Sequence, residues 1–156
     1  MEYTSSDYVK AIAENLINNL DCPYMQQIRD AKPAIAYREC DSMKKSNGRT
    51  VHADCEKVKP SNKQYMNYDY IITTYPRNCV TMTEVQFEIL IYHELLHIQC
   101  YRMSDGQLDC KIRAHDIQDF TRITQQYGEF WSYPDVNVKS LFDVYGSIEK
   151  EEEEDV

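Results

Sequence analysis

The first segment of the chain has apolar residues at four-residue steps, which predicts an amphipathic helix. Thr4, followed by Asp7 three positions later, has the form of a capping box and predicts where this helix begins. The breaker sequence at 21–23, which ends in a proline, predicts where it stops. The residues expected on the buried face of this helix are Tyr8, Ile12, Leu16 and Leu20.

Three later segments have the composition of strands. Residues 34–40 are separated by the turn sequence Ser46-Asn47-Gly48 from a second such segment at 50–58. Residues 68–75 are rich in tyrosine, isoleucine and threonine, which are residue types enriched in strands. Together these segments predict a short, mostly antiparallel sheet of about three strands.

Helical periodicity returns at 84–100, where apolar residues occupy more than one face, as they do in a mostly buried helix. Thr83 and Gln86 form a second capping box at its start. A third helix is expected from about 115 or 116 to 127, and a short one around 139–144. The sequence therefore predicts an α+β fold, in which the sheet packs on a buried helix accompanied by two further helices.

Length and charge bound the organisation of the chain. Its 156 residues are enough for one domain, which we expect to span residues 1–148. The formal net charge is −9, and residues 149–155 hold six acids and one lysine, so the segment 149–156 is expected to be an acidic, disordered tail. The rest has only a mild acidic excess, and direct nucleic-acid binding is not expected. Four widely separated glycines exclude a phosphate-cradling loop.

The sequence also bears on where the protein works. It opens with no basic and apolar leader, and no apolar run is long enough to cross a membrane. We therefore expect a cytoplasmic protein, in the host cytoplasm if it is viral, with no membrane partner. The six cysteines include no Cys-x-x-Cys pair and are expected to be reduced thiols. A disulfide or a second metal site between Cys40 and Cys55 is not expected.

The candidate chemistry lies in the predicted buried helix, in the sequence His93-Glu94-Leu95-Leu96-His97. Residues four apart on a helix lie one turn above each other, so both imidazoles can reach one metal ion. Glu94 is rotated by about 100° from His93, as the helical period requires. That position suits a base that takes a proton from metal-bound water. Two histidines and a glutamate would be costly to bury on an apolar helix without such partners.

A hydrolytic zinc site usually has three protein ligands. A third histidine six residues after the motif is excluded, because Met103 stands there. We favour His115 as the third ligand, since imidazole suits zinc better than carboxylate, and an antiparallel return of the third helix would bring it to the motif. Asp116 and Asp119 are the alternatives, and Asp119 could instead orient a ligating imidazole. His52 is expected to be a surface residue.

Two segments resemble the putative phage metallopeptidase family. They are Leu90-Ile91-Tyr92-His93-Glu94-Leu95-Leu96-His97-Ile98 and His115-Asp116-Ile117-Gln118-Asp119-Phe120. More distantly, the chain looks like the SprT-like zincins, in which a third histidine also lies downstream of the motif. The resemblance runs from Lys32 to Trp131, and these two segments are its specific part. It implies a small zincin-like fold with His93, His97 and His115 on zinc (Zn²⁺) and Glu94 as general base.

The leading functional hypothesis is therefore a zinc-dependent metallopeptidase that acts on a protein or peptide substrate. Tyr127 and Tyr133 follow the third ligand in sequence and are candidates to stabilise an oxyanion, although packing roles are the commoner ones for tyrosine. One alternative is a non-catalytic binding module stapled by zinc, whose fourth position would be closed by a cysteine such as Cys100 or Cys110. Another is a hydrolase of a non-peptide amide.

Overall fold

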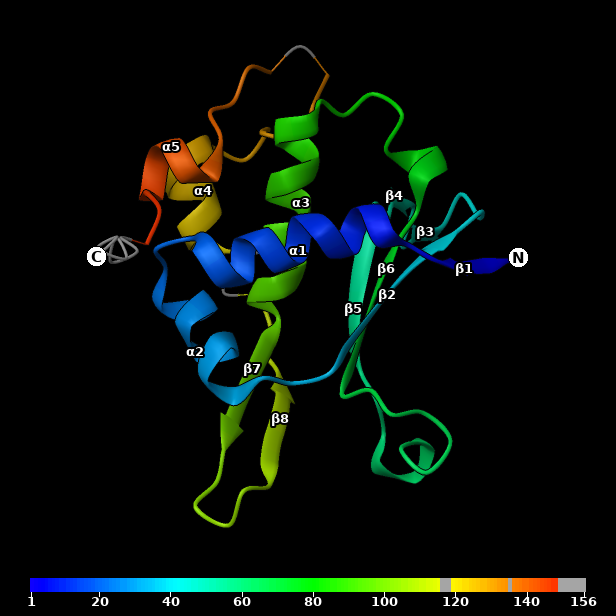
Figure 1. Cartoon of the computed structure of the whole chain (residues 1–156). Coiled ribbons are helices and arrows are strands. Elements are labelled where there is room, and N and C mark those ends of the chain that lie inside the picture. The colour runs from blue at the N-terminus through cyan, green and yellow to red at the C-terminus, as the bar shows by residue number, and fades with distance from the viewer. Residues whose placement is uncertain (116–118, 135, 149–156) are drawn as a thin grey trace, which may run out of the picture.

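The computed structural model describes residues 1–115, 119–134 and 136–148. This part of the chain is an α+β structure (Figure 1), as predicted. The helices are α1 (Asp7–Asn19), α2 (Pro23–Ala31), α3 (Glu84–Leu96), α4 (Thr121–Tyr127) and α5 (Leu141–Tyr145), with 3₁₀ turns η1 (Pro60–Asn62) and η2 (Pro76–Asn78). The strands are β1 (Tyr3–Ser5), β2 (Ile35–Cys40), β3 (Lys45–Ser46), β4 (Arg49–Thr50), β5 (Ala53–Lys57), β6 (Tyr70–Thr74), β7 (Ile98–Arg102) and β8 (Leu108–Ile112).

The main sheet has four strands in the order β1-β2-β6-β5, one more than expected. β2 and β6 run parallel, whereas the two outer pairs are antiparallel. The chain leaves β2, turns through the β3–β4 hairpin and enters β5 on the far side of β6. Alternating polarity identifies strands but does not say which ones are neighbours, and a three-residue strand such as β1 is too short to show a period.

The N-terminal helices differ from the prediction in two ways. Ser6, not Thr4, caps α1, because its hydroxyl accepts a hydrogen bond from the Val9 amide while Thr4 pairs with Glu39 in the sheet. The 21–23 segment does end α1, but Pro23 then becomes the first residue of α2, which was not predicted. Proline is well suited to that position, because the first helical residue needs no hydrogen-bonded amide.

The capping box of α3 is confirmed, since the Thr83 hydroxyl accepts from the Gln86 amide and the Gln86 side chain accepts from the Thr83 amide. The helix ends at Leu96, however, and not at residue 100. Beyond it, β7 and β8 form an unpredicted antiparallel hairpin that projects from the end of α3 (Figure 1). In β7, Ile98 and Cys100 are buried and alternate with more exposed neighbours, which is a strand period.

The third predicted helix begins later than expected. α4 starts at Thr121, so His115 lies in a loop and not at a helix start. Residues 116–118 are outside the described residues. α5 forms where the short helix is expected, so α2 is the one α-helix of the described residues that the sequence does not predict. The predicted acidic tail at 149–156 is also outside the described residues.

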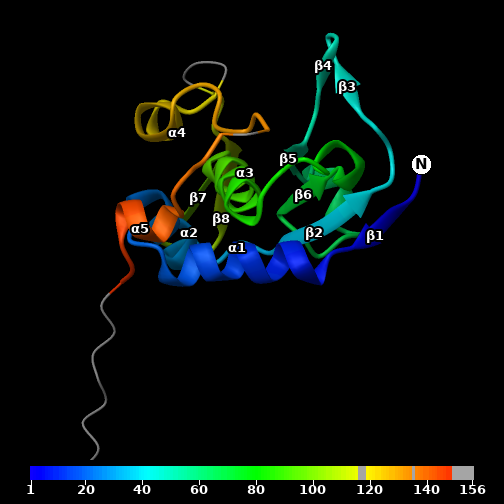
Figure 2. The same ribbon diagram turned by 90° about the horizontal axis from the view of Figure 1, so that it is seen from above.

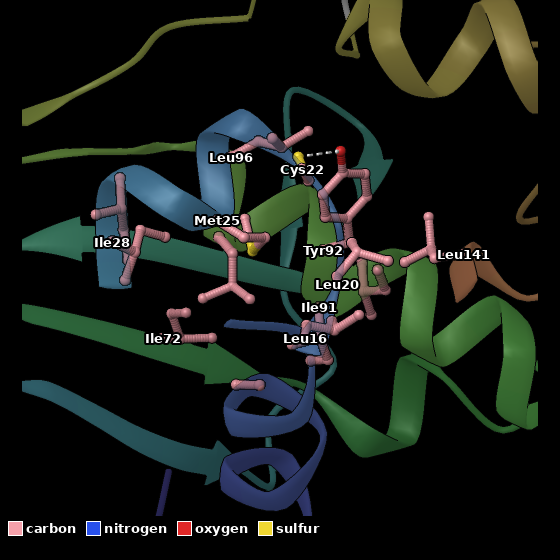
Figure 3. Packing of buried hydrophobic residues seen from close by; sticks show 14 of the residues in the cluster. Leu16, Leu20, Cys22, Met25, Ile28, Ile72, Ile91, Tyr92, Leu96 and Leu141 are labelled. Atoms are coloured by element: carbon pink, nitrogen blue, oxygen red, sulfur yellow. Dashed lines mark hydrogen bonds between the residues drawn. The ribbon is translucent and has the colours of Figure 1, made fainter. Parts of the chain in front are cut away.

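The core lies between the helices and one face of the main sheet, and α3 is at its centre. Figure 2 shows α3 between the sheet on one side and α4 on the other. Side chains from α1, α2, α3 and β6 meet in a continuous apolar cluster, which is closed at one end by Leu141 of α5 (Figure 3). All five residues of β6 are buried. Within the described residues, no helix is long and apolar enough to span a membrane.

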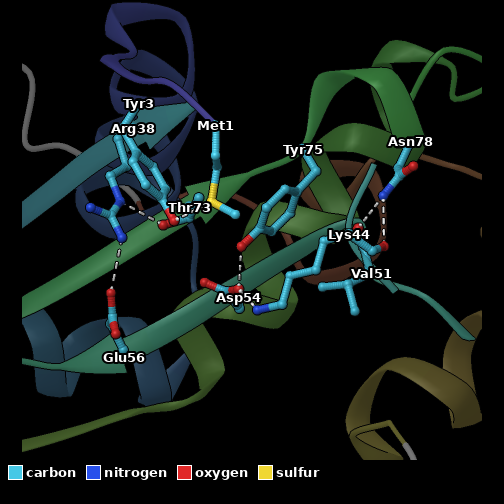
Figure 4. A network of polar contacts seen from close by, with 10 residues as sticks. All are labelled: Met1, Tyr3, Arg38, Lys44, Val51, Asp54, Glu56, Thr73, Tyr75 and Asn78. Atoms are coloured by element: carbon cyan, nitrogen blue, oxygen red, sulfur yellow. Dashed lines mark hydrogen bonds and ion pairs between the residues drawn. The ribbon is translucent and has the colours of Figure 1, made fainter. Parts of the chain in front are cut away.

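The opposite face of the sheet carries a polar network (Figure 4). The Asp54 carboxylate on β5 accepts hydrogen bonds from the Lys44 ammonium at 2.8 Å and the Tyr75 hydroxyl at 2.7 Å. On the neighbouring strands, Arg38 donates to the Thr73 hydroxyl at 2.9 Å and to Glu56 at 3.2 Å. These contacts join the three strands β2, β6 and β5 and fix the edge of the sheet beside α3.

Candidate metal centre

The last turn of α3 and its C-cap present His93 and His97 on one face of the helix. Their ring centroids are 5.3 Å apart, as expected for residues one turn apart. Both side chains are partly exposed, in contrast to their neighbours Leu95 and Leu96, which are fully buried in the core. The helix therefore points its two imidazoles toward solvent while its apolar side faces the interior.

His115 joins these two residues, but not by the predicted route. The β7–β8 hairpin, and not an antiparallel helix, returns the chain to the end of α3, where the Arg113 amide donates to the His97 carbonyl at 2.6 Å. The Nε2 atom of His115 lies 2.9 Å from Nε2 of His93 and 2.9 Å from Nε2 of His97. Phe120 packs its ring within 5.0–5.2 Å of all three imidazole centroids.

The second ring nitrogens of the two helical histidines are both engaged. Nδ1 of His93 contacts the Asp119 carboxylate at 2.5 Å, and Nδ1 of His97 contacts the Arg113 carbonyl at 2.8 Å. Because both partners are acceptors, the network assigns the proton of each neutral ring to Nδ1 and leaves Nε2 with a lone pair. The Nε2 atoms of His93 and His97 both lie 2.9 Å from Nε2 of His115, so one cation could be shared by the three rings.

These three histidines form a group that could hold a metal ion, with ligand atoms within 4.8 Å of one another. No other group of this kind is found among residues 1–115, 119–134 and 136–148. Asp119 lies behind His93, which is where a carboxylate orients a ligating imidazole. Asp116, the other aspartate considered as a ligand, is outside the described residues.

The electrostatics of the site differ between the two helical histidines. Burial lowers the pKa of His97 to about 4, despite its bond to the Arg113 carbonyl. Burial opposes protonation of His93 too, but the Asp119 carboxylate outweighs it and the pKa of His93 is raised. The pKa of Asp119 is lowered in turn, since its bonds to His93 outweigh the effect of burial. His97 is thus held neutral, the form that binds metals.

Glu94 is buried, with 3% of its surface exposed. Its pKa is raised to about 7, mainly by burial; the nearby carboxylates of Asp54 and Asp119 act in the same direction, and His93 opposes them. Its Oε2 atom has no hydrogen-bond partner within the described part of the chain. A buried carboxylate with an unsatisfied oxygen and a pKa near neutrality has the properties of a general base.

Within the described residues, neither His52 nor any cysteine joins this group. His52 is half-buried, not on the surface as expected, and burial lowers its pKa. Tyr127 donates its hydroxyl to the Lys139 carbonyl, and Tyr133 is 55% exposed. Cys100 and Cys110 face each other across the hairpin with sulfurs 3.1 Å apart. All six cysteines are free, and β6 lies between the strands that carry Cys40 and Cys55.

Two partners of the site were not found from the sequence. The Arg113 carbonyl is a backbone group that carries no residue-type signal. Trp131 donates its indole N–H to Oδ2 of Asp119 at 2.7 Å. It is the only tryptophan of the chain and is nearly fully buried. Trp131 stands between two other aromatic residues, Phe130 and Tyr133, so its residue type alone does not single it out.

An α+β fold with three converging imidazoles and a buried glutamate defines a candidate metal-dependent enzyme. The family model for putative phage metallopeptidases matches residues 1–145 of the 156, and the chain belongs to this family. The predicted family membership is therefore confirmed over more of the chain than the two histidine segments alone. The family name indicates a metallopeptidase and implies a metal ion. Neither a curated protein nor a solved structure is detectably similar to the chain.

Proposed function

We propose that the protein is a zinc-dependent peptidase in which His93, His97 and His115 hold zinc and Glu94 is the general base. The observation that carries this proposal is the convergence of three Nε2 atoms, two of them on rings whose Nδ1 atoms face acceptors. Three imidazoles suit zinc, and a three-ligand set is the one that catalytic zinc sites use. The family membership supports the same reading.

Zinc, when bound, would acidify a water molecule and polarise the scissile carbonyl. The proton transfers would be carried out by Glu94, which follows His93 in α3 and has one carboxylate oxygen without a hydrogen-bond partner in the described part of the chain. We propose that this carboxylate takes the proton of the attacking water and returns it to the nitrogen of the leaving amine. Its raised pKa, about 7, suits both transfers at neutral pH.

The sheet edge beside α3 favours an extended peptide as the substrate. β5 is the last strand of the main sheet and pairs with β6 on one side. Its residues Asp54 and Cys55 are close enough to Glu94 for electrostatic interaction with that carboxylate. Main-chain hydrogen bonding to an edge strand is a general mode of peptide recognition, and here it would bring a backbone amide toward Glu94. We therefore propose a protein or peptide substrate over a non-peptide amide.

The alternative function, a non-catalytic binding module with structural zinc, predicts that a fourth protein ligand fills the coordination position that a catalytic site leaves open. A closed site needs a fourth protein ligand, but Cys100 and Cys110 lie within the hairpin, facing each other and not the histidines. The test is a peptide-cleavage screen on metal-free protein before and after adding one equivalent of Zn²⁺, with a hydroxamate as inhibitor. We expect cleavage that depends on zinc and is blocked by the hydroxamate. One tightly bound zinc with no cleavage and no hydroxamate binding would favour the staple.

A further inference from the structure

The carboxylate behind His93 is held from more than one side. Oδ1 of Asp119 contacts His93 Nδ1 at 2.5 Å and accepts from the Phe120 amide at 2.7 Å. Oδ2 accepts from the indole N–H of Trp131 at 2.7 Å. Trp131 is 5% exposed and packs in the main core cluster, so its ring has little freedom to move. Both oxygens are therefore fixed by donors whose own positions are set by the fold.

Trp131 is in turn tied back to the helix that carries His93. The Gln86 amide group donates to the Trp131 carbonyl at 3.0 Å and to the Tyr133 carbonyl at 2.8 Å. Gln86 is 1% exposed and belongs to the capping box of α3. It precedes His93 by about two turns and so lies on the same face of the helix. Hydrogen bonds therefore connect Gln86 of α3 to Trp131, Trp131 to Asp119, and Asp119 to His93 of the same helix.

We propose that Trp131 is a positioning residue that sets the metal affinity of the site through Asp119. The carboxylate torsion of an aspartate is broad and roughly two-fold, so the loss of the indole donor to Oδ2 would leave the orientation of Asp119 toward His93 less firmly fixed. The His93 ring would then have to be ordered when the metal binds, and that ordering weakens binding. This inference rests on the proposed metal site and assigns Trp131 no contact with the metal or the substrate.

The primary test compares Zn²⁺ dissociation constants, measured by competition with a chromophoric chelator, for wild type and Trp131→Phe. Phenylalanine keeps an aromatic ring in the core but lacks the N–H. Losing an outer partner of a metal ligand typically weakens binding by 10–100-fold, and we expect about tenfold here because Trp131 acts through Asp119. Phe130→Leu is the matched control. Phe130 is 57% exposed beside Trp131, and its replacement should leave the constant unchanged.

A double-mutant cycle separates positioning from general damage to the fold. In an Asp119→Ala background, Trp131→Phe should cost less than about twofold, since the bond it removes no longer exists. An equal loss in both backgrounds would overturn the inference. So would identical constants for wild type and Trp131→Phe. If the wild type binds no Zn²⁺ at all, the proposed function fails instead, and that result is distinct from either of these.

A second readout needs neither metal nor a change at Trp131. Because the chain has one tryptophan, its nitrogen-15 NMR spectrum contains one indole N–H cross-peak. In the metal-free wild type, this proton should lie downfield and exchange slowly with water. Asp119→Ala should move it upfield and speed its exchange. A cross-peak that stays unchanged in Asp119→Ala would show that the indole does not donate to Asp119, and would overturn the inference even if Trp131→Phe fails to fold.

Discussion

His93 and Asp119 are 26 residues apart in sequence, yet Nδ1 of the imidazole and Oδ1 of the carboxylate are 2.5 Å apart. The carboxylate lies on the side of the ring away from Nε2, so it fixes the ring without competing for a metal. It also accepts from Phe120 and Trp131, so it is an acceptor for three donors at once. An asparagine cannot reproduce this, because one of its two terminal groups is a donor.

The first prediction follows from that relationship. Asp119→Asn should weaken Zn²⁺ binding by about 10–100-fold, since one of the bonds to His93 or Trp131 becomes a contact between two donors. Asp109→Asn serves as the control, because the Asp109 side chain is 44% exposed and only its loose ion pair with Lys111, at 3.8 Å, is affected. Equal Zn²⁺ affinity in the two variants, measured by chelator competition, would argue against an orienting role for Asp119.

The second prediction concerns the third ligand. His115→Ala should reduce the zinc stoichiometry of purified protein, measured by plasma mass spectrometry, to well below one per chain. His52→Ala is a matched control, since His52 is the one histidine outside the converging group and should retain full occupancy. Unchanged stoichiometry in His115→Ala would move the third-ligand assignment to an aspartate.

The third prediction concerns metal removal. A ligand that binds only the folded state stabilises it by about 2.7 kcal/mol at a free concentration of 100 times Kd. For a chain of this size that amounts to a rise in melting temperature of roughly 5–11 °C. Calorimetry with and without a chelator should show this difference in the wild type. His93→Ala should melt at the same temperature under both conditions, and a persisting shift in that variant would place the bound metal elsewhere.

The fourth prediction tests the core that supports α3. Ile91 is fully buried among α1, α3 and their neighbours (Figure 3), so Ile91→Ala should lower the free energy of unfolding by about 2–5 kcal/mol. Val80→Ala also trims a branched side chain, but Val80 is 80% exposed and its loss should stay within about 0.5 kcal/mol. Urea unfolding measures both. Similar losses in the two variants would contradict the assignment of α3 to the core.

The sequence carries enough information to locate α3 and the two histidines that share one of its faces. A capping box at Thr83 and Gln86 gave the start of the helix, and the spacing of His93 and His97 placed both rings on one face. His115 lies beside them as predicted, but the β7–β8 hairpin brings it there and not an antiparallel helix. The alternating pattern of β7 covers only five residues, 98–102, and directly follows an apolar helix, so the sequence does not distinguish this strand from a continuation of α3.

What could not be predicted depends on contacts between distant parts of the chain. The order of the strands in the main sheet depends on which strands pair after the chain has passed through β3 and β4. The local sequence pattern of a strand does not indicate its neighbours. Trp131 reaches Asp119 from the loop after α4, and the backbone of that loop is hydrogen-bonded to Gln86. No rule of sequence spacing predicts a hydrogen bond from an indole N–H to a carboxylate twelve residues earlier.

The central claim is that Glu94 performs proton transfer at a zinc held by three histidines. The most direct test is peptide hydrolysis by wild type and Glu94→Gln, each verified to hold one zinc per chain. Glutamine keeps the size of the side chain but cannot take a proton, and loss of a general base costs about 10²–10⁴-fold in rate. We predict zinc-dependent cleavage by the wild type and a loss of that order in the variant at full zinc occupancy. Cleavage by Glu94→Gln at the wild-type rate would contradict the account.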